Sequence, residues 1–153
     1  MGAKKKLGNL PKAPRGKSIV IPSRGRLPGA DNSDQRLSWR FAHVDHEGPW
    51  GFDKVNSGTL VEILGKLREF ERFTLNELRN TSGTFESYEL PAAPLCKEAY
   101  ERLDAMRRDD MTEIHRLRFQ GAQRLYGFLD GNVFHVVWWD PEHKVYPWKP
   151  KNT

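Results

Sequence analysis

Cysteine is nearly absent from this sequence, since Cys96 is the single thiol among 153 residues. One thiol excludes an internal disulfide, a CxxC redox pair and a zinc site built from several thiolates. No neighbour of Cys96 in the sequence favours a thiolate, so we interpret it as a small apolar residue of a helix rather than a nucleophile. This cysteine usage is typical of a reducing compartment, and we expect the protein in the cytoplasm.

Long apolar runs are absent as well. No segment approaches the roughly 18 apolar residues of a membrane span, and no apolar stretch follows the basic N-terminus as a secretory signal requires. The sequence therefore predicts a soluble protein with no membrane partner. The motifs GxxxxGK[ST], GxGxxG, HExxH and GxSxG are also missing, which leaves phosphate-loop, dinucleotide, zincin and hydrolase-elbow chemistry without support.

The charge is distributed unevenly along the chain. Residues 1–36 hold nine Lys or Arg and two Asp, whereas residues 37–153 carry slightly more acidic than basic groups. The first segment is rich in Gly and Pro and poor in apolar residues, so we expect a largely disordered basic arm. Such an arm is either a nucleic-acid-binding arm, a solubilising leader or a mis-assigned start. Residues 37–153, with most of the aromatic side chains, are predicted to form a single α+β domain.

Apolar periodicity predicts an N-terminal strand, two to three helices and then a three- to four-stranded antiparallel meander. Residues 37–44 alternate as in a strand, and helical spacing follows over residues 58–72. A capping box that begins at Thr74 predicts a short second helix, and a third helix is expected from residue 94 to about residue 107. The intervening residues 81–93 are predicted to be a loop. We expect the helices to pack on one face of the sheet.

The pair Asp130-Gly131 predicts a hairpin, because glycine tolerates the positive φ of a tight turn. A two-residue turn at this position places Tyr126 opposite His135. In this register Arg124, Tyr126 and His135 share the sheet face that is open to solvent, while the opposite face packs under the helices. One contiguous core is expected from Phe41, Leu60, Leu64, Leu67, Leu103, Leu125, Phe134, Val136 and Trp138.

One short segment has the residue types of a metal site. Imidazole and carboxylate groups at His43, Asp45 and His46 suit zinc or manganese. His43 lies on an apolar strand face, however, and no further ligands are evident in the sequence. We therefore predict no metal site and no cofactor.

The strands of the predicted meander carry many basic and aromatic side chains, which converge because consecutive strands are usually neighbours. Cleavage of RNA through its own 2′-hydroxyl needs a group that takes the hydroxyl proton, an acid for the leaving 5′-oxygen and cations for the phosphorane. Imidazole and phenol groups can transfer the protons, and guanidinium or ammonium groups can stabilise the charge. The residues concerned are His115, Arg116, Arg118, Arg124, Tyr126, His135, His143, Lys144 and Tyr146.

The order of elements, with H-R-L-R-F at residues 115–119, R-L-Y-G-F at residues 124–128 and H-K-V-Y at residues 143–146, resembles the RelE/ParE superfamily of bacterial toxin–antitoxin modules. The resemblance covers about residues 37–148. It implies a toxin-like mRNA endonuclease that acts on free or ribosome-bound RNA and has an antitoxin protein as its partner. It also implies phosphate-binding arginines and a Tyr or His that transfers protons. The family is usually shorter, and its gyrase-directed branch lacks the nuclease residues.

We therefore predict a metal-independent endoribonuclease without a cofactor, with RNA as the partner. Its predicted catalytic residues are Arg124, Tyr126, His135 and His143, and its predicted nucleic-acid-binding residues are Arg116, Arg118, Lys144 and Tyr146. Two alternatives stay open. The same basic and aromatic face could bind nucleic acid without cleaving it, or its exposed aromatic side chains could dock a partner protein.

Overall fold

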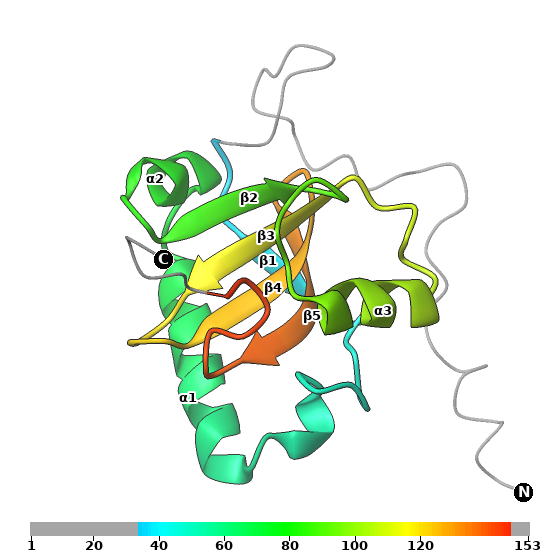
Figure 1. Ribbon diagram of the computed structural model, residues 1–153. Coiled ribbons are helices and arrows are strands. Elements are labelled where there is room, and N and C mark those ends of the chain that lie inside the picture. Colours follow the sequence, from blue (N-terminus) through cyan, green and yellow to red (C-terminus); the bar gives the residue numbers. More distant parts are fainter. Residues whose placement is uncertain (1–33, 148–153) are drawn as a thin grey trace, which may run out of the picture. The chain divides into compact units, whose positions relative to one another are not determined.

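The computed structural model describes residues 34–147, so residues 1–33 of the predicted basic arm, and residues 148–153, lie outside the described part. The α+β class is confirmed (Figure 1). Among the described residues no helix has the length and apolar character needed to cross a membrane. The elements are β1 (Ser38–Arg40), a short 3-10 helix (Phe52–Lys54), α1 (Ser57–Phe70), α2 (Leu75–Asn80), β2 (Phe85–Glu89), α3 (Lys97–Ala105), β3 (Glu113–Arg118), β4 (Arg124–Asp130) and β5 (Val133–Asp140).

The five strands form one sheet in the order β1-β5-β4-β3-β2 (Figure 1). The pairs β2–β3, β3–β4 and β4–β5 are antiparallel, whereas β1 runs parallel to β5. The predicted meander is present as β3, β4 and β5. The prediction of a loop over residues 81–93 was wrong, because Phe85–Glu89 pairs with β3 along its whole length. Pairing with a neighbouring strand overrides the weak local pattern of F-E-S-Y-E.

Helices lie on both faces of the sheet (Figure 1), and their side chains contribute to a cluster on each face. The expected packing on one face holds for α1 and α2, but α3 packs on the opposite face. The single predicted core is therefore two clusters, and Phe41, Leu60 and Leu64 are exposed. The α1 side contains Leu37, Ile63, Leu67, Phe70, Leu75, Leu78, Phe85, Leu117, Phe119, Leu125, Phe134, Val136 and Trp139. The α3 side contains Trp50, Leu95, Ala99, Leu103, Ile114, Tyr126, Phe128, Val137, Trp138 and Val145.

Local capping explains where the first two helices begin. The side chain of Asn56 accepts a hydrogen bond of 2.8 Å from the Thr59 N–H and caps α1. The predicted capping box of α2 is confirmed: Thr74 Oγ1 accepts from the Glu77 N–H at 3.1 Å, and Glu77 Oε1 accepts from the Thr74 N–H at 3.3 Å.

The predicted β4–β5 hairpin is present with a different turn. Asp130 pairs with Val133, so the two turn residues are Gly131 and Asn132. Gly131 has a φ of 61° and Asn132 has none in the positive range, which is the φ pattern of a type II′ turn. The predicted register was wrong because the turn starts one residue later than expected.

A bulge shifts the pairing again. Tyr126 lies opposite Trp138 rather than His135, and Val137 is left without a partner on β4. The bulge lies beside Gly127, where a Cβ atom would be only 2.3 Å from the His135 carbonyl oxygen. Glycine is therefore the residue that lets β5 approach this closely.

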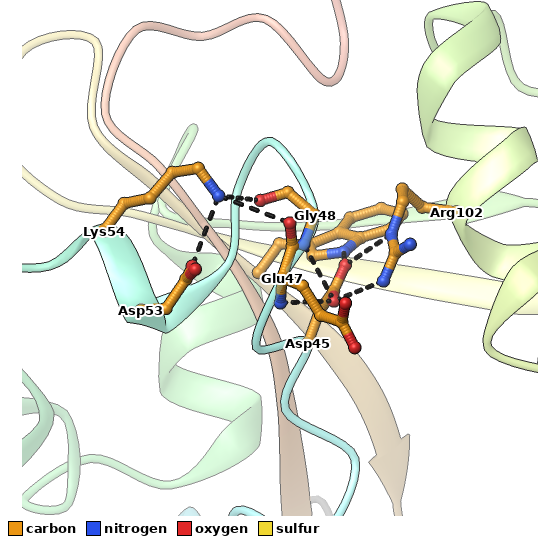
Figure 2. A network of polar contacts seen from close by, with 7 residues as sticks. Asp45, Glu47, Gly48, Asp53, Lys54 and Arg102 are labelled. Carbon is orange, nitrogen blue, oxygen red and sulfur yellow. Dashed lines mark hydrogen bonds and ion pairs between the residues drawn. The ribbon is translucent and has the colours of Figure 1, made fainter.

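The buried carboxylate of Asp45 joins the loop after β1 to α3 and β5 (Figure 2). It accepts hydrogen bonds from Arg102 Nη2 at 2.6 Å, Arg102 Nε at 3.0 Å, Trp138 Nε1 at 3.0 Å and the Gly48 N–H at 3.2 Å. Burial alone would raise the pKa of this carboxyl, but the hydrogen bonds outweigh that effect and lower the pKa below its ordinary value. The Asp45 N–H donates to the Val137 carbonyl at 3.0 Å, beside the bulge.

Asp45 is thus a structural residue with its acceptor capacity in use. Among the described residues no group of three or more His, Cys, Asp or Glu side chains could hold a metal ion.

Asp45→Asn should lower the free energy of unfolding by about 3 kcal/mol, because it leaves Arg102 partly buried without its counter-charge. The carboxylate contributes its full stabilisation above its ordinary pKa of 3.8. This stabilisation is lost as the pH falls through the lower pKa that Asp45 has in the folded protein. The difference between wild type and variant should therefore shrink below about pH 4. Urea unfolding at several pH values measures both effects.

Asp53→Asn is the matched control, since Asp53 is an exposed carboxylate of the same region that pairs with Lys54 at 3.2 Å. It should change stability by less than about 1 kcal/mol. Equal effects of the two variants would contradict the role given to Asp45.

Candidate nucleic-acid interface

A cavity of about 480 Å³ opens near the β2 edge of the sheet, on the face that α3 covers. Its walls come from the strands β2 and β3, from the residues before α3 and from the segment after β5. We call it the arginine–tyrosine cavity. Its lining residues are Glu86, Tyr88, Pro94, Arg116, His143, Tyr146 and Pro147.

Strand register brings the basic and aromatic side chains of this region together. Arg116 lies opposite Glu86 on β2 and opposite Tyr126 on β4. Arg118 lies opposite Arg124 at the end of the β3–β4 pair. Because side chains alternate between faces along a strand, these five residues point to the same side of the sheet.

Arg116 is held by two neutral oxygen acceptors. Its Nη1 donates to the Tyr88 hydroxyl at 3.0 Å, and its Nη2 donates to the Gly83 carbonyl at 3.0 Å. Its Nε is buried without a hydrogen-bond partner. Burial raises the pKa of the Tyr88 phenol, so this group stays a neutral acceptor and donor. The Tyr88 ring stacks on Tyr146 with centroids 4.7 Å apart.

Arg124 extends the same positive region. Its Nη1 donates to the carbonyls of Gly121 at 2.6 Å and Gln123 at 2.9 Å. Burial, and then the charges of Arg116 and Arg118, lower the pKa of Arg124. The register places Arg118 opposite Arg124, with Arg116 two residues before Arg118 on β3. In the part of the chain that the structure describes, none of the three pairs with a carboxylate. The guanidinium groups therefore form no close ion pair there, although the Glu86 carboxylate lines the same cavity as Arg116.

Tyr126 lies beneath the arginines and is fully buried. The expectation that Arg124 and Tyr126 face solvent was wrong, since both are buried. The covering elements on this face are α3 and the segment after β5. Burial strongly raises the pKa of the Tyr126 phenol, and its hydroxyl has no hydrogen-bond partner.

The segment after β5 carries His143 and Tyr146 to the cavity. Asp140 fixes this segment by accepting hydrogen bonds from the Lys144 N–H at 3.0 Å and the Val145 N–H at 2.8 Å. His143 has a φ of 60°, which is uncommon for a residue with a side chain. Strained backbone of this kind gathers at functional sites.

Five of the predicted site residues are not among those that line this cavity: Arg118, Arg124, Tyr126, His135 and Lys144. Lys144 forms an exposed ion pair of 2.6 Å with Glu142 and lines a separate cavity of about 600 Å³. His135 lies five residues before Asp140 on β5, about 17 Å along the strand. Asp140 is the residue opposite Arg124, so His135 and Arg124 stand at opposite ends of the sheet.

His115 lies on the α1 side of the sheet, away from the cavity. It is buried beside Phe85, with ring centroids 5.6 Å apart. Burial and the nearby Arg79 lower the pKa of His115 to about 4, so this imidazole is neutral at pH 7.

Sequence reasoning missed Glu86 and Tyr88, because the segment that carries them was predicted to be a loop. The alternation of F-E-S-Y-E was the pattern that could have placed both on one face of a strand. With them the cavity gains a carboxylate and an aromatic ring for stacking.

Comparison with family models, with curated proteins and with solved structures gave no match. The RelE/ParE resemblance thus rests on the quoted residues and the order of elements.

Tyr126→Phe should raise the free energy of unfolding by about 1 kcal/mol, because it removes a buried hydroxyl without a partner. Tyr100→Phe is the matched control and should lower stability by about 1 kcal/mol, since the Tyr100 hydroxyl donates to the carbonyls of Pro91 and Ala93. Chemical denaturation measures both. A loss of stability in Tyr126→Phe would mean that this hydroxyl has a partner.

Proposed function

We propose that the protein is an endoribonuclease that binds single-stranded RNA at the arginine–tyrosine cavity and cleaves it by attack of the 2′-hydroxyl. The observation that carries this proposal is the strand register that places Arg116, Arg118 and Arg124 on one sheet face without an ion-pair partner among the described residues. Of the three, Arg116 lines the cavity together with Glu86 and His143. Uncompensated guanidinium groups favour a polyanion, and a carboxylate with an imidazole can transfer two protons.

RNA binding in this proposal uses charge and stacking. Arg118 is exposed and can contact a phosphate directly. Arg116 is buried and lies in the wall of the cavity. The ring of Tyr146 is half-buried on Tyr88, so its outer face can stack on an unpaired base. This arrangement suits a single strand whose bases are splayed apart.

Cleavage needs no redox partner. The Glu86 carboxylate takes the 2′-hydroxyl proton, the 2′-oxygen attacks the adjacent phosphorus, and the bond from phosphorus to the 5′-oxygen breaks. The His143 imidazolium donates its proton to that leaving oxygen. Arg116 stabilises the negative charge of the phosphorane from the cavity wall, and Arg124 adds its positive charge from the neighbouring strand outside the cavity lining. The products are a 2′,3′-cyclic phosphate and a 5′-hydroxyl.

A toxin role, with an antitoxin protein as partner, is part of the same proposal through the RelE/ParE resemblance. Its consequence is growth arrest on expression in a bacterium, relieved by loss of the acid–base pair.

Glu86→Gln and His143→Asn should each slow cleavage of a single-stranded RNA by about 10²- to 10⁴-fold while RNA affinity changes little. Asparagine is chosen at His143 because it tolerates the φ of 60°. Gel analysis of end-labelled RNA measures the rate and identifies the cyclic phosphate. A substrate with a 2′-deoxyribose at the cleaved position should resist.

Glu89→Gln and His46→Asn are the matched controls, since Glu89 lies on the other face of β2 and His46 is exposed elsewhere. Both should cleave like the wild type. Binding without cleavage by the wild type would replace this proposal with a non-catalytic RNA-binding module. Full activity of both site variants would refute the assigned acid and base.

Arg118→Ala should weaken RNA binding and reduce the slope of log Kobs against log salt by about 0.7, the value for one lost phosphate contact with a single strand. Stability should hardly change, because Arg118 is exposed. Fluorescence anisotropy in a Glu86→Gln background measures the slope without cleavage. Arg72→Ala, an exposed arginine after α1, is the control, and an equal effect there would show that binding is not confined to this site.

A further inference from the structure

A second cluster of ionisable side chains lies near the turn between β4 and β5. His43 from the loop after β1, Arg108 from beyond α3 and His135 from β5 line one cavity of about 400 Å³. The ring centroids of His43 and His135 are 5.1 Å apart, and Arg108 Nη2 is 2.7 Å from His43 Nδ1. Since a guanidinium can only donate, His43 Nδ1 accepts from Arg108. Three segments distant in sequence thus place their nitrogen atoms around one space.

The end of α3 fixes the position of Arg108. The Arg108 N–H donates to the Leu103 carbonyl at 2.7 Å, and the Arg107 N–H donates to the Asp104 carbonyl at 3.0 Å, the pattern of a Schellman motif. Arg107 has a φ of 57° at the position where glycine is usual. A strained residue that other contacts hold in place is an indication of function, and here it aims the next side chain over His43.

The Arg108 guanidinium lies against the imidazole of His43 in this cavity. Burial, followed by the charges of Arg108, His135 and Arg40, lowers the pKa of His43. Asp130 also lines the cavity, yet among the described residues it forms no ion pair with Arg108 or Arg40. His135 Nδ1 is buried and has no hydrogen-bond partner. An anion in this cavity would accept from the Arg108 guanidinium and give His135 Nδ1 a partner.

We propose that this cavity binds a phosphate monoester. One guanidinium and two imidazoles supply donors from separate directions, which matches a dianion with three acceptor oxygens. The rest of the wall includes Met111, Phe128 and Leu129, so an organic group on the phosphate has apolar side chains to contact. The volume lies within the range of about 300 to 1,000 Å³ of small-ligand sites. The cavity shares no lining residue with the arginine–tyrosine cavity.

The test follows the imidazole NMR resonances of His43 and His135 in the full chain. The added ligands are inorganic phosphate, a nucleoside 5′-monophosphate and a dinucleoside monophosphate, with sodium chloride at equal ionic strength as reference. Phosphate and the monophosphate should shift both sets of resonances and raise the titration midpoint of His43, because a bound dianion favours the imidazolium. The diester should leave them unchanged.

Arg108→Ala should weaken phosphate binding by about tenfold or more, the effect of losing one charge-assisted hydrogen bond. Arg107→Ala removes the same charge from a residue that does not line the cavity and should change affinity by less than about twofold.

Four results would each overturn the proposal: no response to phosphate, an equal response to chloride, a response to the diester alone, or full binding by Arg108→Ala. The outcome is independent of RNA cleavage, because Glu86, Arg116 and His143 lie in the other cavity.

Discussion

The buried carboxylate of Asp45 is the contact that joins the two halves of this fold. The carboxylate accepts hydrogen bonds from Arg102 of α3 and Trp138 of β5. The backbone N–H of Asp45 donates to the Val137 carbonyl at the bulge. A buried carboxylate is costly unless donors surround it, so this loop is stable only where α3 and the bulge are both in place. The short β1, the bulge and the position of α3 therefore depend on one another.

One face of the sheet is covered by α3 and by the segment after β5, so most of its side chains are buried. Two separate cavities remain on this face. One cavity lies at Arg116 near β2, and another lies at His43 near the β4–β5 turn. The two residues with side chains that have positive φ in the described part are Arg107 and His143, and each adjoins or lines one of these cavities. Backbone strain and open basic space thus coincide at both places, which favours binding over a purely structural role.

Local sequence was sufficient for part of the candidate site. Alternation along β4 places Arg124 and Tyr126 on one face, as the sequence indicated. The register between β3 and β4, which the structure supplies, adds Arg116 and Arg118 to that face. The partner of His135 could not be predicted, because it depends on where the turn begins, and the partner of Tyr126 depends in addition on the bulge beside Gly127. Burial of Tyr126 was equally beyond local pattern, since its cover comes from α3 and from Val145, neither of which adjoins it in sequence.

The sequence alone determined the elements that short-range interactions stabilise: the α+β class, the capped starts of α1 and α2, and the β4–β5 hairpin. These depend on side-chain periodicity and on hydrogen bonds within a few residues. Only the tertiary structure decided that β1 pairs parallel with β5, that β2 exists as a strand, and that both sheet faces are covered. The physical reason is that each of these features rests on contacts between segments far apart in sequence, for which local periodicity carries no information.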